Sequence, residues 1–275
     1  MLDAILKYQF LQNAVLAGIL TSIACGIIGV IVIEKKLVML SGGIAHTSLG
    51  GVGLGYLLGF EPILGAFLFS IAASVSIGAI SRRKASHSDV AIGLFWSCGM
   101  ALGILFVSLM KSYPPDLTSY LFGNILSVTQ VDLKLMAGLT VIVLLVICVL
   151  FDTWKAYLFD PEFAQVMGIW TSFLDYVLLI LVAMTVVVMI RAVGIILVLA
   201  LLTAPAATAG LLIKSFRLRM VLAIVLGAVF CFAGLWLSYS LNISSGASIV
   251  ILSGVCYFAV YAVKSLYARR KRVAD

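Results

Sequence analysis

The chain is too apolar to be a water-soluble globular protein. Of its 275 residues, 64% are hydrophobic and only 11% are charged, and the mean hydropathy is +1.24. So little polar surface could not cover the apolar residues, which excludes a soluble fold and indicates a protein that crosses a membrane several times.

Nine apolar runs follow one another along the chain, separated by short polar, charged or Pro/Gly-containing breaks. A spanning helix needs about 20 mostly apolar residues. We expect such helices at 10–33, 38–58, 62–80, 90–109, 133–151, 173–190, 193–213, 220–241 and 247–264. The prediction is an all-α bundle of nine transmembrane helices, or eight if one run is re-entrant, in a single domain covering residues 1–275.

The basic residues, which give a net charge of +7, gather in alternate loops. If the first helix ends in the cytoplasm, the loops on that side hold Lys35, Lys36, Arg82, Arg83, Lys84, Lys155, Lys214, Arg217, Arg219, Lys264, Arg269, Arg270, Lys271 and Arg272, and only Lys7, Lys111, Lys134 and Arg191 remain outside. The positive-inside rule then places the N-terminus outside and the basic tail, 265–275, in the cytoplasm. A basic segment beside a membrane contacts lipid headgroups, so no nucleic-acid partner is expected.

The sequence contains no nucleotide-binding signature. There is no GxxxxGK[ST] phosphate loop, so we expect that the chain does not hydrolyse ATP and is not itself an enzyme. Ionisable residues near the spans are few, mainly His46, Arg191 and the boundary residues Asp89 and Asp175. A carrier coupled to protons or sodium usually buries a relay of acids at membrane depth, so secondary transport is disfavoured.

A short cytoplasmic helix is predicted within 159–168, in the sequence "FDPEFAQVMG". Asp160 suits the N-cap, Pro161 the first turn and Glu162 the positive end of the helix dipole, while Gly168 can end the helix. A helix lying on the inner leaflet is the alternative. The two acids and the absence of Lys or Arg from this stretch disfavour an anionic membrane surface, so we favour a protein partner.

His46 lies eight residues into the second apolar run, about 12 Å along a helix. A buried imidazole must be hydrogen-bonded or functional, and neutral imidazole is a common ligand of transition metals. Two interpretations remain: His46 has a function, such as binding a metal, or it ties two helices together by a hydrogen bond. The glycines around it, Gly42, Gly43, Gly50, Gly51, Gly53 and Gly55, allow another helix to approach closely.

Six segments, in order, resemble the permease subunits of the bacterial ABC-type manganese, zinc and iron uptake systems. They are "NAVLAGILTSIACGIIGVIVIEKKLVMLSGGIAHTSLGGVGLG", "HSDVAIGLFWSCGMALGILF", "LTSYLFGNILSVTQVDL", "FDPEFAQVMGI", "LVLALLTAPAATAGLL" and "GLWLSYSLNISSGASIVILSG". The resemblance implies a type II ABC importer fold in the bacterial plasma membrane, with no tightly bound cofactor. It also implies three kinds of protein partner: a second permease copy in a homodimer, two ATPase subunits that use the ATP, and an extracytoplasmic metal-binding protein.

The resemblance also implies roles for particular residues. His46 occupies the position of the family's metal-binding histidine, and the helix within 159–168 is the coupling helix that enters a groove on the ATPase. Its coupling residues are Asp160, Pro161, Glu162, Phe163, Ala164 and Gly168.

The chain departs from the family pattern near the expected metal site. Gly42 and Asn242 stand where aspartate is common, Ala45 where serine is common, and Gly50–Gly51 where proline–glycine is common. Asn242 remains a candidate ligand. Manganese favours carboxylates, whereas imidazole with few oxygens suits zinc, so we expect zinc first and manganese or iron next. The alternatives are a permease for another small substrate and an intramembrane enzyme with His46 as base, although no HExxH motif or facing acid pair supports the enzyme.

Overall fold

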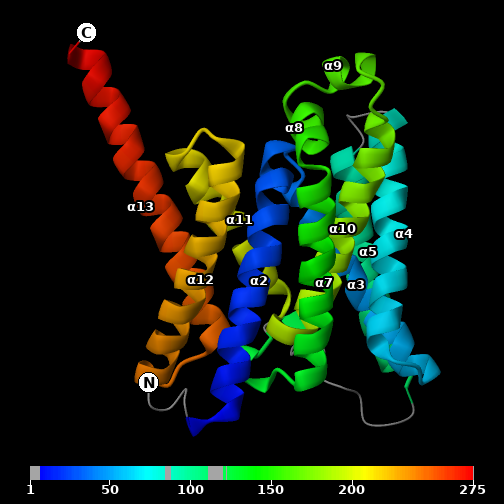
Figure 1. The fold of residues 1–275 in the computed structure, drawn as a ribbon. Helices are drawn as coiled ribbons and strands as arrows, with labels where there is room; N and C mark the ends of the chain where they lie inside the picture. The colour runs from blue at the N-terminus through cyan, green and yellow to red at the C-terminus, as the bar shows by residue number, and fades with distance from the viewer. Residues whose placement is uncertain (1–6, 84–87, 111–119, 122, 275) are drawn as a thin grey trace.

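A computed structural model describes residues 7–83, 88–110, 120–121 and 123–274, and in these ranges every regular element is a helix. The long helices are α2 (Gln9–Glu34), α3 (Val38–Leu58), α4 (Pro62–Arg83), α5 (Ser88–Ser108), α7 (Gln130–Val149), α10 (Thr171–Val193), α11 (Ile195–Leu212), α12 (Phe216–Leu241) and α13 (Ser245–Ala274). They run alternately up and down a single bundle, with the chain termini at opposite ends (Figure 1). The all-α prediction is confirmed, and each long helix corresponds to one predicted run.

Three short helices lie at the two ends of the bundle. α8 (Phe151–Phe159) and α9 (Pro161–Val166) project from one end, which we call the α9 end. η2 (Ile125–Ser127) lies at the opposite end, called the η2 end. The basic tail was expected to follow the last span, but α13 continues through it to Ala274. Lys and Arg are good helix formers and no Pro or Gly interrupts 255–274, so the helix continues into the tail.

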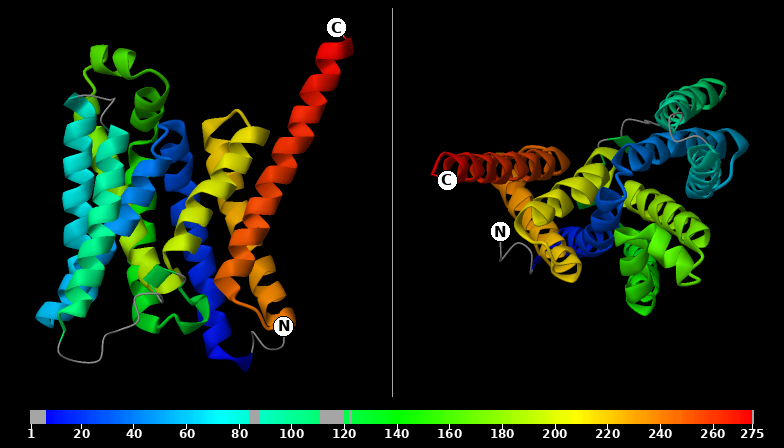
Figure 2. Two further views of the ribbon diagram at one scale, coloured as in Figure 1. Left: turned by 180° about the vertical axis from the view of Figure 1, so that it is seen from behind. Right: turned by 90° about the horizontal axis from the view of Figure 1, so that it is seen from above.

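Helix α2 lies near the centre of the bundle and contacts α7, α11 and α12. Seen from above, α3, α4 and α5 form one side, and α11, α12 and α13 form the other (Figure 2). Helix α10 joins the two sides through contacts with α2, α3, α4, α7 and α11.

By length and composition, eight of the long helices in the described residues are able to cross a membrane, and α3 is not among them. It has 21 residues, enough to span, but its glycines, its hydroxyl side chains and His46 lower its hydropathy. Most of its residues are buried against α4, α5 and α10, so protein rather than lipid surrounds it. A helix shielded in this way needs no continuous apolar surface, so a low hydropathy does not prevent α3 from lying at membrane depth.

Glycine permits the close packing of α3. A Cβ atom on Gly51 would lie 1.9 Å from the carbonyl oxygen of Gly65 in α4, and a Cβ on Gly99 of α5 would lie 2.4 Å from Cα of Thr47. No larger residue fits at such distances, so these glycines let the α3 backbone touch both neighbours.

Candidate functional site

His46 is held against α5 by an aromatic stack. Its ring lies parallel to the indole of Trp96, with the ring centroids 4.1 Å apart and 9° between the planes. Both side chains are half-buried. The Nδ1 atom of His46 is buried and has no hydrogen-bond partner. The helix-tie interpretation expects a hydrogen bond, and Nδ1 makes none within the described residues.

The hydroxyl groups beside His46 are bonded elsewhere. Thr47 donates to the carbonyl oxygens of Gly43, at 2.7 Å, and of Phe95, at 2.9 Å. Ser48 donates to the carbonyl oxygen of Ala45 at 2.5 Å. These bonds occupy the hydroxyl groups of Thr47 and Ser48. Nδ1 of His46, beside them on α3, has no such partner in the described residues.

The described part of one chain holds no complete cluster of the usual metal-binding side chains. In the described residues, no three His, Cys, Asp or Glu side chains come close enough together to hold an ion. Asn242, the second candidate ligand, is the exposed C-cap of α12 at the η2 end, with φ 53° and ψ 43°. Asparagine suits this left-handed cap. Because α12 and α3 lie on different sides of α2, the fold does not bring Asn242 to His46 within one chain (Figure 2).

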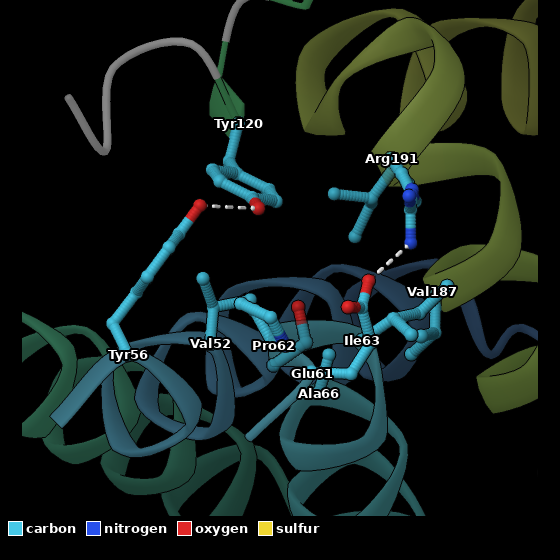
Figure 3. Close-up of a pocket in the computed structure, with 11 residues that line it drawn as sticks. Val52, Tyr56, Glu61, Pro62, Ile63, Ala66, Tyr120, Val187 and Arg191 are labelled. Atoms are coloured by element: carbon cyan, nitrogen blue, oxygen red, sulfur yellow. Dashed lines mark hydrogen bonds and ion pairs between the residues drawn. The ribbon is translucent and has the colours of Figure 1, made fainter. Parts of the chain in front are cut away.

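A cavity of about 290 Å³ opens near the η2 end, between α3, α4 and α10 (Figure 3). Tyr56 and Tyr120 face each other across one side of it, with their hydroxyl oxygens 3.0 Å apart. Burial and the hydrogen bond with Tyr56 raise the pKa of Tyr120 above its usual value, so its hydroxyl stays protonated. The cavity reaches along α3 to Ser48. Ser48 lies two positions beyond His46 and therefore on a different face of the helix.

Arg191 forms the charged wall of this cavity. Its Nη1 donates to Oε1 of Glu61 at 2.7 Å, and its Nε lies 2.8 Å from Oδ1 of Asp132. The sequence singled out Arg191 as an ionisable residue near a span, but did not identify Glu61, Asp132, Tyr56 or Tyr120 as its neighbours. Glu61 is 130 positions away from Arg191, so no local pattern signals this cluster.

Helix α9 forms much as its sequence predicts. The Asp160 side chain accepts a hydrogen bond from the Phe163 backbone N–H at 2.9 Å, and Pro161 occupies the first turn. The helix ends at Val166, two residues before Gly168, whose φ of 80° suits glycine at the turn that follows. Ala164 is fully buried against the bundle, whereas Phe163 is 55% exposed. Glu162, Val166, Met167 and Trp170 are also exposed.

Below α9, a polar cluster joins α8 to α2 and α10. The Tyr157 hydroxyl donates to the Asp175 carboxylate, and the Lys35 ammonium lies 3.4 Å from the centroid of the Tyr157 ring. Burial lowers the pKa of Lys35, and the nearby Asp175 carboxylate partly opposes that shift. Helix α8, which carries α9, is thereby attached to the start of α10 and the end of α2.

Comparison with known proteins identifies a family whose members resemble almost the whole chain. The model of the ABC 3 transport family matches residues 7–264. An uncharacterised membrane protein of Synechocystis is 42% identical over 94% of this chain and 92% of its own. The manganese import system permease protein ScaB of Streptococcus gordonii is 38% identical over 96% of this chain and 95% of its own.

A solved structure agrees in fold. PsaBC from Streptococcus pneumoniae, solved in complex with Fab, superposes with a TM-score of 0.85 at 34% identity, over 94% of each chain. The predicted helical membrane fold of an ABC importer permease is therefore confirmed, and the chain is a multi-pass plasma-membrane protein rather than an enzyme. The chain belongs to the ABC 3 transport family, as a permease subunit of an ABC importer.

Proposed function

We propose that this permease carries a divalent transition metal into the cell and that manganese is its principal substrate. The observation that carries the proposal is the half-buried His46 in α3, whose Nδ1 is buried and has no partner. An unpaired imidazole nitrogen at membrane depth is costly unless it has a function, and histidine is the commonest protein ligand of metal ions.

Manganese replaces zinc as the first choice. The zinc prediction rested on Gly42 and Asn242, which replace two oxygen ligands of the family pattern. ScaB, at 38% identity, is named for manganese import. Water or binding-protein oxygens can complete the shell of a weakly held manganese ion, and weak binding suits a conducting path.

The working assembly is a homodimer of permeases with two ATPase subunits and an extracytoplasmic metal-binding protein. The homodimer is the assembly that the family resemblance implies, and it would contain a second copy of His46. Asn242 could enter such a site only through conformational change or another copy, so it is a secondary candidate. We place the α9 end in the cytoplasm, because the charge distribution predicts it.

The exposed α9 helix is the proposed contact with the ATPase. Phe163 is 55% exposed and follows Glu162 in the first turn, and buried Ala164 fixes the helix to the bundle. Asp160 and Pro161 start this helix and Gly168 turns the chain after it, so these residues shape the contact rather than make it.

Metal uptake by the reconstituted complex tests the proposal. Liposomes containing the permease and ATPase are supplied with the binding protein and with Mn²⁺, Zn²⁺ or Fe²⁺ in turn. We expect Mn²⁺ uptake to be fastest, and His46→Ala and His46→Asn to abolish it while the ATPase still binds. Leu58→Ala is the matched control, because Leu58 is a 66% exposed apolar residue of the same helix. Near-normal uptake by His46→Asn would show that His46 packs the helices together and does not bind the transported ion.

A further inference from the structure

Trp96 is the side chain that orients His46. The indole covers one face of the imidazole at 4.1 Å with the planes nearly parallel, and no other aromatic ring contacts His46 in the described residues. A metal binds imidazole at the edge, in the plane of the ring and along a nitrogen lone pair. Stacking on a face therefore does not block the in-plane lone-pair directions of the two nitrogens, while it restricts rotation of the ring.

The backbones that carry these two rings are locked together. Thr47, next to His46, donates to the carbonyl oxygen of Phe95, next to Trp96, at 2.9 Å. A Cβ on Gly99 would lie 2.4 Å from Cα of Thr47, and a Cβ on Gly103 would lie 2.7 Å from the carbonyl oxygen of Leu49. Contacts at backbone level on both sides of the stack prevent α5 from shifting along α3. The relative position of the two rings is thus set by the helix pair.

Gly42 makes room for the indole. A Cβ at position 42 would lie 3.5 Å from the Trp96 ring, in ordinary contact, and any longer side chain there would compete with the ring for space. Position 42 is one helical turn before His46, on the same face. The indole therefore lies against α3 from Gly42 to His46 and occupies the side from which a second protein ligand on α3 could reach the same ion.

We propose that Trp96 is a positioning residue that fixes the plane of the His46 imidazole and thereby sets the preference of the permease for a transition metal over calcium or magnesium. This inference rests on the proposed role of His46 as a ligand. Manganese accepts an imidazole nitrogen beside its oxygen ligands, whereas calcium and magnesium are bound by oxygen ligands. An imidazole free to rotate binds less tightly, while oxygen ligands from water or backbone do not depend on its orientation. Loss of Trp96 should therefore weaken Mn²⁺ binding and narrow the discrimination against Ca²⁺.

The test measures Mn²⁺ binding and competition in the purified permease–ATPase complex. Free Mn²⁺ is followed by electron paramagnetic resonance during titration, with and without excess Ca²⁺, for the unsubstituted complex, Trp96→Leu, Trp96→Phe and His46→Asn. Outer-shell partners of metal ligands are worth about 10- to 100-fold in affinity. We expect Trp96→Leu to weaken His46-dependent Mn²⁺ binding by about tenfold and to make it more sensitive to Ca²⁺. Trp96→Phe, which keeps an aromatic face, should recover most of the affinity, to within about threefold.

Leu94→Ala is the matched control, because Leu94 lies two positions from Trp96 on α5 and is 60% exposed. It should bind Mn²⁺ as the unsubstituted complex does. A purely structural role of Trp96 would lower the yield of the complex but leave the affinity of the surviving complex, and its Ca²⁺ sensitivity, unchanged.

The outcomes separate the two proposals. If His46→Asn loses Mn²⁺ binding while Trp96→Leu keeps the affinity and selectivity of the unsubstituted complex, the positioning role is wrong and the metal site stands. If His46→Asn binds and transports Mn²⁺ normally, the ligand role of His46 fails, and the positioning role fails with it.

Discussion

Arg191 is ion-paired with Asp132 through Nε and Oδ1, 2.8 Å apart, and this pair ties the last turn of α10 to the first turn of α7. Only 8% of the Asp132 side chain is exposed, whereas Glu61, the other partner of Arg191, is 55% exposed. Removing Arg191 would leave Asp132 a mostly buried carboxylate without its cation, although Thr129 still donates to it. The two pairs should therefore differ in their contribution to stability.

We predict that Arg191→Met destabilises the permease by about 1–3 kcal/mol, because a buried charge loses its partner. Glu61→Gln should cost less than about 1 kcal/mol, because the pair is exposed. For a chain of this size, Arg191→Met should lower the melting temperature by roughly 3 °C or more. Glu61→Gln should lower it by less than about 3 °C. Thermal unfolding of the detergent-purified protein measures both. Equal losses in the two variants would show that burial of Asp132 does not matter.

Gly51 cannot carry a side chain without separating α3 from α4. Its Cβ would lie 1.9 Å from the carbonyl oxygen of Gly65, a backbone atom that cannot move aside. Gly51→Ala should therefore cost about 3 kcal/mol or more and lower the yield of monodisperse protein in size-exclusion chromatography. Gly93→Ala is the control, since a Cβ there meets nothing within 4 Å. It should be neutral or stabilise α5 slightly, and a similar loss in both variants would contradict the close-packing argument.

Replacing the exposed first turn of α9 should uncouple transport from ATP hydrolysis. We expect Glu162→Lys combined with Phe163→Asp to lower metal uptake at least tenfold, since a buried aromatic anchor of an interface is often worth 2 kcal/mol or more. The permease itself should fold normally, because Phe163 is 55% exposed in the free chain. Co-purification of the ATPase and metal-stimulated ATP hydrolysis are measured together. Leu266→Ala, an exposed position on α13, should change neither; normal uptake by the α9 variant would remove the coupling assignment.

The orientation of the bundle is testable with single cysteines. Trp170, 81% exposed after α9, and Ile243, 49% exposed after α12, mark the two ends. With the native cysteines replaced, we expect a membrane-impermeant maleimide to label Ile243→Cys but not Trp170→Cys in intact cells. The reverse pattern would invert the topology.

Other positions that the sequence assigned to a side of the membrane are less suitable for labelling. The positive-inside rule also predicts that Arg83, Trp154 and Arg270 face the cytoplasm and that Tyr113 and Asn242 face outward. Trp154 is fully buried, so a cysteine there would not react. Tyr113 lies outside the described residues, as do the side chains of Arg83 and Arg270. Asn242 lies at the η2 end but holds a left-handed cap that cysteine disfavours.

Local signals in the sequence were sufficient to locate the helices. Long apolar runs, and the Gly, Pro and charged residues between them, act locally, so the nine runs and the Asp160–Pro161 start of α9 were predictable near their observed positions. The same local reasoning located His46 within α3. The same reasoning was wrong at the basic tail, which was expected to follow the last span. Helix α13 continues through the tail because no Pro or Gly there ends it.

Which residues contact one another could not be predicted from the sequence. How the helices pack determines that Trp96 stacks on His46 and that Arg191 lies between Glu61 and Asp132. It also determines that Asn242 is separated from His46. In a soluble helix the apolar stripe shows which face is buried, but a membrane helix is apolar on its lipid face as well as its protein face. The hydrophobic pattern therefore says where a helix begins and ends, and not which side of it touches its neighbours.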